Sequence, residues 1–145
     1  MAGNIRLKLV SLGGLKFDDD VYEVILPTLD GQIGVLPGHM PLVSVATTGV
    51  ISVRRNQSDR DDHQEYFAIS GGAIEVADNV LSVLVDDADH ADEINEQEVQ
   101  KAYELAQKLK AEAKDQVSLN NAQSLVDRQA VRLQVAGLKR RNRRS

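Results

Sequence analysis

The chain has 145 residues, of which 42% are hydrophobic, 27% charged and 3% aromatic, and its formal net charge is −5. That length suits one ordinary domain or two small ones, and an acidic chain with so few aromatic residues is not expected to bind nucleic acid. The absence of cysteine excludes a disulfide framework and a thiolate metal site, and no apolar run approaches the roughly 20 residues of a membrane-spanning helix, so membrane association is expected only through a partner.

The first 88 residues alternate between apolar and polar side chains in short runs, the period typical of β-strands. Turn residues separate these runs as in antiparallel sandwiches and barrels, and no helical pattern lies between them, which argues against a parallel sheet. We therefore predict an all-β N-terminal sandwich of short antiparallel strands over residues 1–88. The predicted strands are Ile5–Val10, Val21–Leu26, Gln32–Leu36, Leu42–Ala46, Gly49–Arg54, Glu65–Ser70, Ala73–Ala77 and Val80–Val85.

Three stretches of this half are predicted to be turns or loops. The consecutive aspartates Asp18, Asp19 and Asp20 predict a solvated turn, because no calcium-loop spacing follows them. Residues 55–63 are polar and charged, and predict an exposed hairpin loop. All three prolines of the chain lie within residues 27–42, and with the glycines there they predict a rigid, shaped surface loop.

An acidic band without Lys or Arg follows the last predicted strand and marks a boundary near residue 88. It consists of Asp86, Asp87, Asp89, Asp92, Glu93, Glu96 and Glu98. Within it, Asn95 and Glu98 have the spacing of a helix N-cap and its capping-box partner. The sequence period then changes from two to that of a helix.

Two apolar stripes at helical spacing follow, and predict a C-terminal antiparallel α-helical hairpin over residues 89–145. The pattern lapses between Lys114 and Asn121, which predicts the connecting loop there, and Gly137 is predicted to end the second helix. The stripes are rich in alanine, so their pairing buries little area and stabilises by only a few kcal/mol at ~25 cal/mol per Å². Two readings stay open: a permanently folded hairpin, or a conformational switch that exchanges partners.

No arrangement of residues predicts catalysis. The three histidines, including His39 in the rigid loop, are too dispersed for a metal site or a triad. Arg128 and Arg132 lie one helical turn apart, so they form either a clamp for phosphate or carboxylate groups or a solvated helix face with local ion pairs. The basic end of the chain is either a frayed, solvated terminus or a docking element for an acidic surface. Its basic residues are Lys139, Arg140, Arg141, Arg143 and Arg144.

The segment DGQIGVLPGHMPL, residues 30–42, and the segment FAISGGAIEV, residues 67–76, resemble the epsilon subunit of F-type ATP synthases, and the resemblance extends along nearly the whole chain. It implies a non-catalytic subunit of the central rotor stalk, whose sandwich holds the gamma subunit and rests on the ring of membrane c subunits. It also implies that Gly31, Gln32 and His39 fall in the loop that faces the c ring. Many family members carry an acidic residue where Gln32 stands, so only a hydrogen-bonded contact is expected there.

The resemblance further implies that the C-terminal helices can rise into the alpha/beta catalytic head and inhibit ATP hydrolysis. The residues expected to dock on an acidic loop of the head are Arg128, Arg132, Lys139, Arg140, Arg141, Arg143 and Arg144. Some members bind ATP through a motif that opens the first helix. Here Asn95, Glu98 and Val99 replace its Asp, Arg and Ala, so weak or absent ATP binding is expected, with no cofactor and no metal.

Family membership would place the protein at the cytoplasmic face of the bacterial inner membrane, as a peripheral component, with the plastid thylakoid as the other location. Three other functions stay open from the sequence. One is a free-standing adaptor of sandwich and hairpin, the second is a hairpin that senses ATP, and the third is an enzyme whose activity depends on His39.

Overall fold

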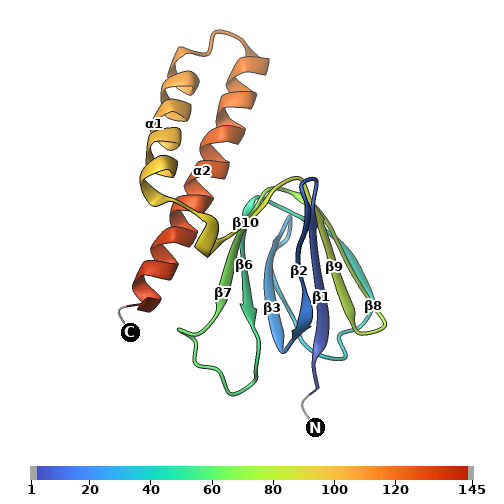
Figure 1. Ribbon diagram of the computed structural model, residues 1–145. Helices are drawn as coiled ribbons and strands as arrows, with labels where there is room; N and C mark the ends of the chain where they lie inside the picture. The colour runs from blue at the N-terminus through green and yellow to red at the C-terminus, as the bar shows by residue number, and fades with distance from the viewer. Residues whose placement is uncertain (1–2, 144–145) are drawn as a thin grey trace.

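The computed structural model describes residues 3–143 and confirms a β-sandwich followed by a helical hairpin (Figure 1). Ten strands come first, and the last two elements are the helices α1 (Glu96–Glu112) and α2 (Gln116–Arg143), preceded by a short 3-10 helix, η1 (Ala91–Glu93). The strands are β1 (Ile5–Ser11), β2 (Gly14–Val21), β3 (Glu23–Thr28), β4 (Gly31–Val35), β5 (Leu42–Ala46), β6 (Gly49–Arg54), β7 (Glu65–Ile69), β8 (Gly72–Ala77), β9 (Val80–Val85) and β10 (Ala88–His90).

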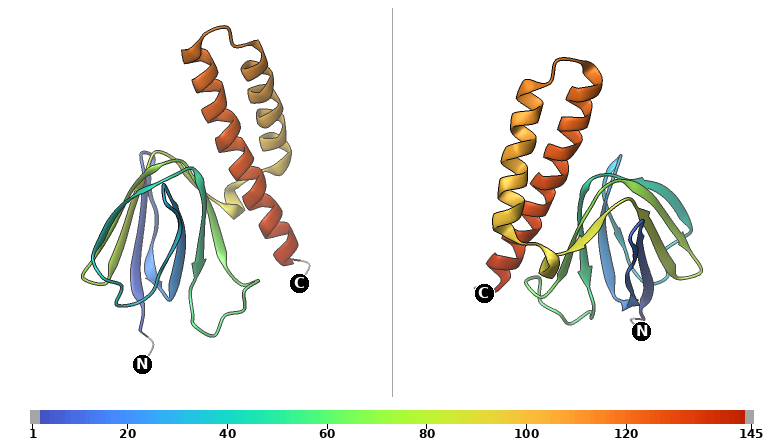
Figure 2. Two further views of the ribbon diagram at one scale, coloured as in Figure 1. Left: turned by 180° about the vertical axis from the view of Figure 1, so that it is seen from behind. Right: turned by 45° about the horizontal axis from the view of Figure 1, so that its top comes forward.

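The strands form two layers that are joined at one corner (Figure 2). One layer has the order β10-β7-β6-β3-β4, and the other has the order β5-β8-β9-β1-β2. The layers meet where Thr28 of β3 pairs with Ala46 of β5. Alternate residues of each strand point into the space between the layers, where Leu7, Leu81 and Phe67 are almost fully buried. This packed core fixes which side chains remain on the outer faces.

One pair of strands departs from the predicted antiparallel arrangement. β1 and β9 form a parallel ladder from Arg6–Val80 to Ser11–Val85, although every other pair is antiparallel. A parallel pair needs a long crossover, and here the other seven strands between β1 and β9 provide it in place of a helix. The absence of helical patterns therefore did not exclude a parallel pair.

The predicted solvated turn at Asp18, Asp19 and Asp20 is also wrong, because these residues lie within β2. β2 is the edge strand of its layer and pairs only with β1. Its carboxylates therefore stay exposed while the backbone continues the ladder, and Arg6 of β1 lies 2.8 Å from Asp18. Charged residues on an edge strand also discourage pairing with other chains. Pro27 lies inside β3 rather than at its end, and the short strand β10 was not predicted.

The helical hairpin differs from the prediction in the position of its turn. The connection comprises only residues 113–115, and Asn120 and Asn121 are helical. Asp115 caps α2: its carboxylate accepts hydrogen bonds from the Ser118 N–H at 2.7 Å and the Ser118 hydroxyl at 3.1 Å. These bonds lower the pKa of Asp115, so the stability they add is present above the ordinary aspartate pKa and is lost as the pH falls through the lower folded-state pKa.

α2 is much longer than α1, with 28 residues against 17, because it continues through Gly137 to Arg143. Its second half lies against the outer face of β7, while α1 packs on the half that projects beyond the sandwich (Figure 1). The contact buries Val135 of α2 between Tyr66, Ala68 and Ala91. The predicted boundary at residues 88 and 89 falls inside β10, which pairs with β7.

Candidate functional site

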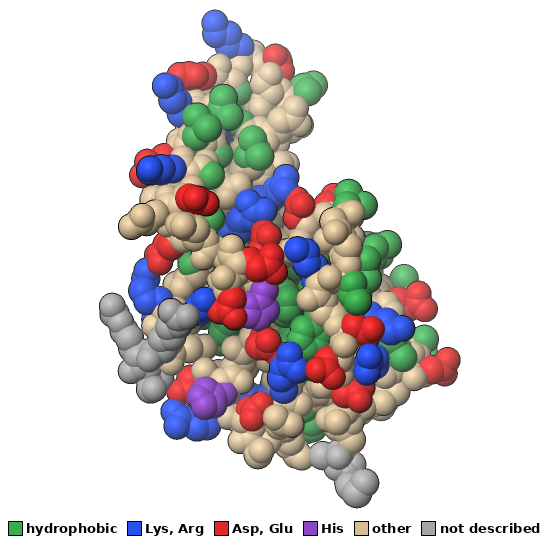
Figure 3. Space-filling model, in the orientation of Figure 1, with side chains coloured by type: hydrophobic (Ala, Val, Ile, Leu, Met, Phe, Trp, Pro, Cys, Tyr) green, Lys and Arg blue, Asp and Glu red, His purple; other side chains and the backbone are tan. Residues whose placement is uncertain are grey.

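An apolar row crosses the outer face of the layer β5-β8-β9-β1-β2. Cross-strand pairing places five side chains in line: Val45, Ala73, Leu84, Val10 and Leu15. Val45, Leu84 and Leu15 are 50%, 57% and 62% exposed, so no described part of the chain covers the row. Figure 3 shows hydrophobic side chains gathered over β8 and β9 on this side of the molecule. An apolar stripe of this kind on a folded domain indicates a protein interaction surface.

A β-bulge extends the apolar row onto β2. The pairing shifts between Leu9 and Val10, so that Leu9 faces Phe17 but Val10 faces Leu15. Lys16 is the extra residue, and it turns Leu15 to the outer face while Phe17 stays in the core. The adjacent cross-strand row is charged, because it contains Glu75 and Lys8. The surface is thus an apolar stripe with a polar border.

The structure separates the three residues that were expected to share one loop. Gly31 and Gln32 begin β4, immediately after the turn that links it to β3, and Gly31 has a φ of 110°. The Thr28 hydroxyl closes this turn by donating a 2.6 Å hydrogen bond to the Gly31 carbonyl. The neighbouring Leu29 is exposed, so the end of the sandwich presents a tight turn with an apolar tip.

His39 lies beyond the other end of β4. The Gly38 N–H donates to the Asn79 side-chain oxygen at 2.9 Å, which ties the loop of His39 to the turn between β8 and β9. β4 has five residues, so about 16 Å of strand separates its two ends. The imidazole Nδ1 of His39 lies 2.7 Å from the Met40 carbonyl oxygen. A flat partner that contacts Gly31 and Gln32 at one end of the sandwich would therefore not reach His39.

Arg128 and Arg132 are paired with the acidic band, not with α1. Arg128 forms an ion pair with Asp87, and the Arg132 Nε donates to Asp89 at 2.8 Å. Both partners of this contact were visible in the sequence: the acidic band, which contains no Lys or Arg, and two arginines one helical turn apart. The sequence did not show that residues 41 and 43 positions apart would meet, because that depends on how α2 lies on β7.

The basic residues nearer the C-terminus continue the same pattern. The Lys139 Nζ lies 2.5 Å from Asp92, and Arg140 pairs with Glu96 of α1. The Arg141 Nε donates to the Gly137 carbonyl at 3.4 Å. Arg143 is the last residue of α2, and Arg144 lies outside the described residues. In this structure, four of the residues expected to dock on a partner form ion pairs within the chain.

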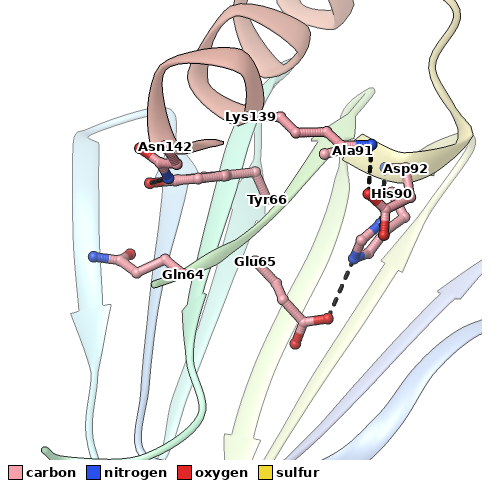
Figure 4. Close-up of a pocket in the computed structure, with 8 residues that line it drawn as sticks. All are labelled: Gln64, Glu65, Tyr66, His90, Ala91, Asp92, Lys139 and Asn142. Atoms are coloured by element: carbon pink, nitrogen blue, oxygen red, sulfur yellow. Dashed lines mark hydrogen bonds and ion pairs between the residues drawn. The ribbon is translucent and has the colours of Figure 1, made fainter. Parts of the chain in front are cut away.

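A cavity of about 290 Å³ opens between β7, η1 and the end of α2 (Figure 4). The His90 Nε2 lies 3.2 Å from Glu65, and the Asn142 amide donates to the Tyr66 hydroxyl at 3.1 Å. His90 also accepts the Asp92 N–H at 3.0 Å, which caps η1. Of these contacts, the bond between Asn142 and Tyr66 ties the end of α2 to β7, and the two bonds of His90 fix η1 beside it. Within residues 3–143, no group of three or more His, Asp or Glu side chains is placed to hold a metal ion.

No helix in the described part of the chain is long and apolar enough to span a bilayer. The helix that was compared with an ATP-binding motif begins as predicted, because the Asn95 side chain accepts the Glu98 N–H at 3.1 Å. This capping contact commits Asn95 to the helix terminus and leaves an acidic side chain, Glu98, in its first turn.

Comparison with known proteins gives consistent matches. Residues 4–91 match the family model described as the ATP synthase delta/epsilon chain, beta-sandwich domain. The ATP synthase epsilon chain of Herpetosiphon aurantiacus is 34% identical over 139 residues, covering 96% of this chain and 98% of the relative. The chloroplast epsilon chain of Anthoceros angustus is 35% identical over 109 residues, covering 75% of each chain. In fold, a chain of the Euglena gracilis mitochondrial ATP synthase superposes with a TM-score of 0.75 at 24% identity, covering 92% of this chain and 81% of that one.

Proposed function

Because this chain belongs to the ATP synthase epsilon-chain family, we propose that it is the non-catalytic epsilon subunit in the central stalk of a proton-translocating F-type ATP synthase. In this role the subunit couples the rotation of gamma to the c ring. The single observation that supports it is the exposed apolar row on the sandwich, because a partner that covered the row would remove its side chains from water. We assign this row to the gamma subunit. A covered apolar row would make the sandwich turn together with gamma.

We propose that the end of the sandwich with Leu29, Gly31 and Gln32 contacts the c-subunit ring. This end carries an exposed leucine at a tight turn, and the uncharged Gln32 can donate and accept hydrogen bonds there. His39 belongs to the opposite end and is not part of this contact. The protein thus meets the membrane only through the ring, and we place it at the cytoplasmic face of a bacterial membrane or the equivalent face of a thylakoid, as its bacterial and chloroplast relatives suggest.

We propose that the helical hairpin restrains ATP hydrolysis when it leaves the sandwich and docks on the alpha/beta head. We take the described structure to be the lowered state, in which three ion pairs and the burial of Val135 hold α2 against the sandwich and η1. Partly exposed ion pairs contribute about 0.2–1 kcal/mol each. A partner that offers better acidic contacts can therefore raise the hairpin.

The test is ATP hydrolysis by a catalytic head that retains gamma but lacks its epsilon subunit. The full chain is expected to bind and inhibit. A chain that ends at Glu93 is expected to bind without inhibiting, because that end point keeps the pairing of β10 with β7 and the Lys16–Glu93 ion pair. If both chains bind and neither inhibits, the inhibitory role of the hairpin is refuted and the coupling role stands. If neither binds, the epsilon assignment fails and the adaptor function replaces it.

We expect no ATP binding in the micromolar range by the isolated chain. Glu98 would repel phosphate, and Asn95, Arg128 and Arg132 are engaged in the contacts described above. Isothermal titration with Mg-ATP is expected to show no saturable heat. A saturable isotherm with micromolar affinity would instead support the hairpin as an ATP sensor.

A further inference from the structure

We infer that the open edge of β4 pairs with β4 of a second copy of this chain, in an antiparallel register centred on Ile33. Such a contact is isologous, because a two-fold axis relates the two copies and each uses the same five residues. It would continue the layer β10-β7-β6-β3-β4 into the same layer of the other copy. The inference goes beyond the proposed function and concerns the chain before it is assembled with its partners.

β4 is an edge strand with a free row of backbone groups. Within residues 3–143 it pairs only with β3, and the register places Gln32 opposite Pro27 and Gly34 opposite Ile25. The Pro27 carbonyl accepts the Thr47 N–H at 3.2 Å, so it points away from β4, and Pro27 and Gln32 exchange no hydrogen bond. Antiparallel pairs alternate between bonded and non-bonded, so Gln32 and Gly34 both direct their N–H and C=O to the open edge.

Local hydrogen bonds limit this row at both ends. Asp30 and Leu36 come next in the same alternation along the strand. The Asp30 N–H donates to the Thr28 hydroxyl at 3.2 Å. The Leu36 carbonyl accepts the His39 N–H at 3.1 Å. The two residues between them therefore remain as the ones with both backbone groups available to an added strand.

One register of two β4 strands uses all of these free groups. When Gln32 faces Gly34 of the other copy, symmetry provides this pair twice, and each pair exchanges both of its N–H···O bonds. Ile33 then faces Ile33, and Gly31 faces Val35. Gln32 and Val35 each lie opposite a glycine, while the β-branched Ile33 side chains form a cross-strand pair. A register shifted by two residues would bring a free residue opposite one whose backbone group is already bonded.

The other outer edges of the two layers carry features that oppose pairing. β2 presents three consecutive aspartates, and β10 has only three residues. Residues 31–35 contain neither a charged side chain nor a proline. Native proteins commonly protect an edge strand with charges, proline or shortness. β4 lacks the first two protections, so it is the edge that an added strand can use.

The same contact would cover exposed apolar residues at both ends of β4. Leu29 is 72% exposed and Leu36 is 42% exposed. The register brings the turn of one copy, with Leu29, beside Leu36 of the other. Pairing also covers Gln32, which was assigned above to the c ring. Pairing and the ring contact would therefore exclude each other, so the dimer is a state of the unassembled chain.

The first test is sedimentation equilibrium of the full chain, which carries a formal net charge of −5, at about 1 M salt, where the Debye length is about 3 Å. The natural chain should dimerise reversibly. Gly34→Pro removes one edge N–H from each copy and should weaken the dimer by about 5- to 150-fold, the effect of two backbone hydrogen bonds. The matched control, Gly34→Ala, keeps the N–H and should change the dimer constant by about twofold or less. A monomer at millimolar concentration, or a dimer unchanged by Gly34→Pro, would overturn the inference.

The second test does not depend on the folding of the proline variant. The natural chain has no cysteine, so Ile33→Cys places one thiol at the centre of the register. The Cα atoms of this non-hydrogen-bonded pair would lie about 4.5 Å apart, within the range of a disulfide, and mild oxidation should give a covalent dimer. Gln32→Cys is the control: Gln32 is more exposed, but its counterpart lies diagonally at about 7–8 Å, too far for a disulfide. Equal or greater cross-linking of Gln32→Cys would overturn the register.

These tests are separate from that of the proposed function, because they use the isolated chain. If the chain dimerises through β4 but does not bind the catalytic head, the proposed function fails while this inference stands. If it binds the head but stays monomeric alone, the inference fails while the proposed function stands.

Discussion

Leu84→Glu is expected to weaken binding to the gamma subunit by roughly 30- to 700-fold, the range of a central contact worth about 2–4 kcal/mol. Leu84 occupies the middle of the apolar row, between Ala73 and Val10. A carboxylate there would lose its water when gamma covers the row, and nothing in the row is charged to pair with it. Surface plasmon resonance with an immobilised head that contains gamma would measure the change.

The matched control is Leu105→Glu on α1. Leu105 is 59% exposed and Leu84 57%, so both substitutions place a charge at an equally open apolar position. Neither should shift the melting temperature by more than a few degrees, because exposed substitutions change stability by about 0.5 kcal/mol or less. Leu105→Glu should bind gamma normally. If Leu84→Glu also binds normally, the gamma contact must be moved to another face of the sandwich.

Gly72→Ala is expected to lower the stability of the chain by about 3 kcal/mol or more, which would reduce the melting temperature by about 10 °C. A Cβ at residue 72 would lie 2.0 Å from the Leu84 carbonyl oxygen and 2.8 Å from the Val85 Cα. Both atoms belong to the backbone of the neighbouring strand, so no side chain can move aside to relieve the clash. β8 and β9 would have to separate where Gly72 pairs with Val85.

Gly34→Ala provides the control for this prediction. A Cβ at residue 34 would meet no atom within 4 Å, and the backbone there does not require a positive φ. Alanine at such a position stabilises by about 0.4–1 kcal/mol, because it restricts the unfolded chain. Thermal unfolding followed by circular dichroism should therefore separate the two variants clearly. Equal melting temperatures would show that the sheet adapts at Gly72.

Local sequence patterns predicted most of the sandwich. Leu42–Ala46 and Gly49–Arg54 have the predicted bounds, because alternation of apolar residues and flanking turn residues act within the strand itself. β2 was missed because three consecutive aspartates suggest a turn. A strand can carry them only at the edge of a sheet, and the sequence does not show that β2 lies at an edge. β10 has three residues and pairs with a strand some twenty positions earlier, so it has no local signal.

The partners of the basic residues on α2 could not be predicted for a related reason. Helix periodicity showed that Arg128 and Arg132 share a face, but the position of that face depends on how Val135 packs against Tyr66 and Ala68. The same limit applies to Gly31 and His39. They are close in sequence, but the length of β4 between them places them at opposite ends of the sandwich.

The unequal lengths of the two helices have a mechanical consequence. The ion pairs and hydrogen bonds of α2 to the sandwich run from Arg128 to Asn142, while the hairpin tip near Asp115 projects beyond it. A force applied at the tip is transmitted along α2 as along a rigid arm, and it loads the Arg128–Asp87 pair first and the Asn142–Tyr66 hydrogen bond last. Under such a force the contacts would break one at a time. Each step would require only the force that breaks a single contact, so a load at the tip would separate α2 from the sheet at a lower force than lifting the whole helix at once.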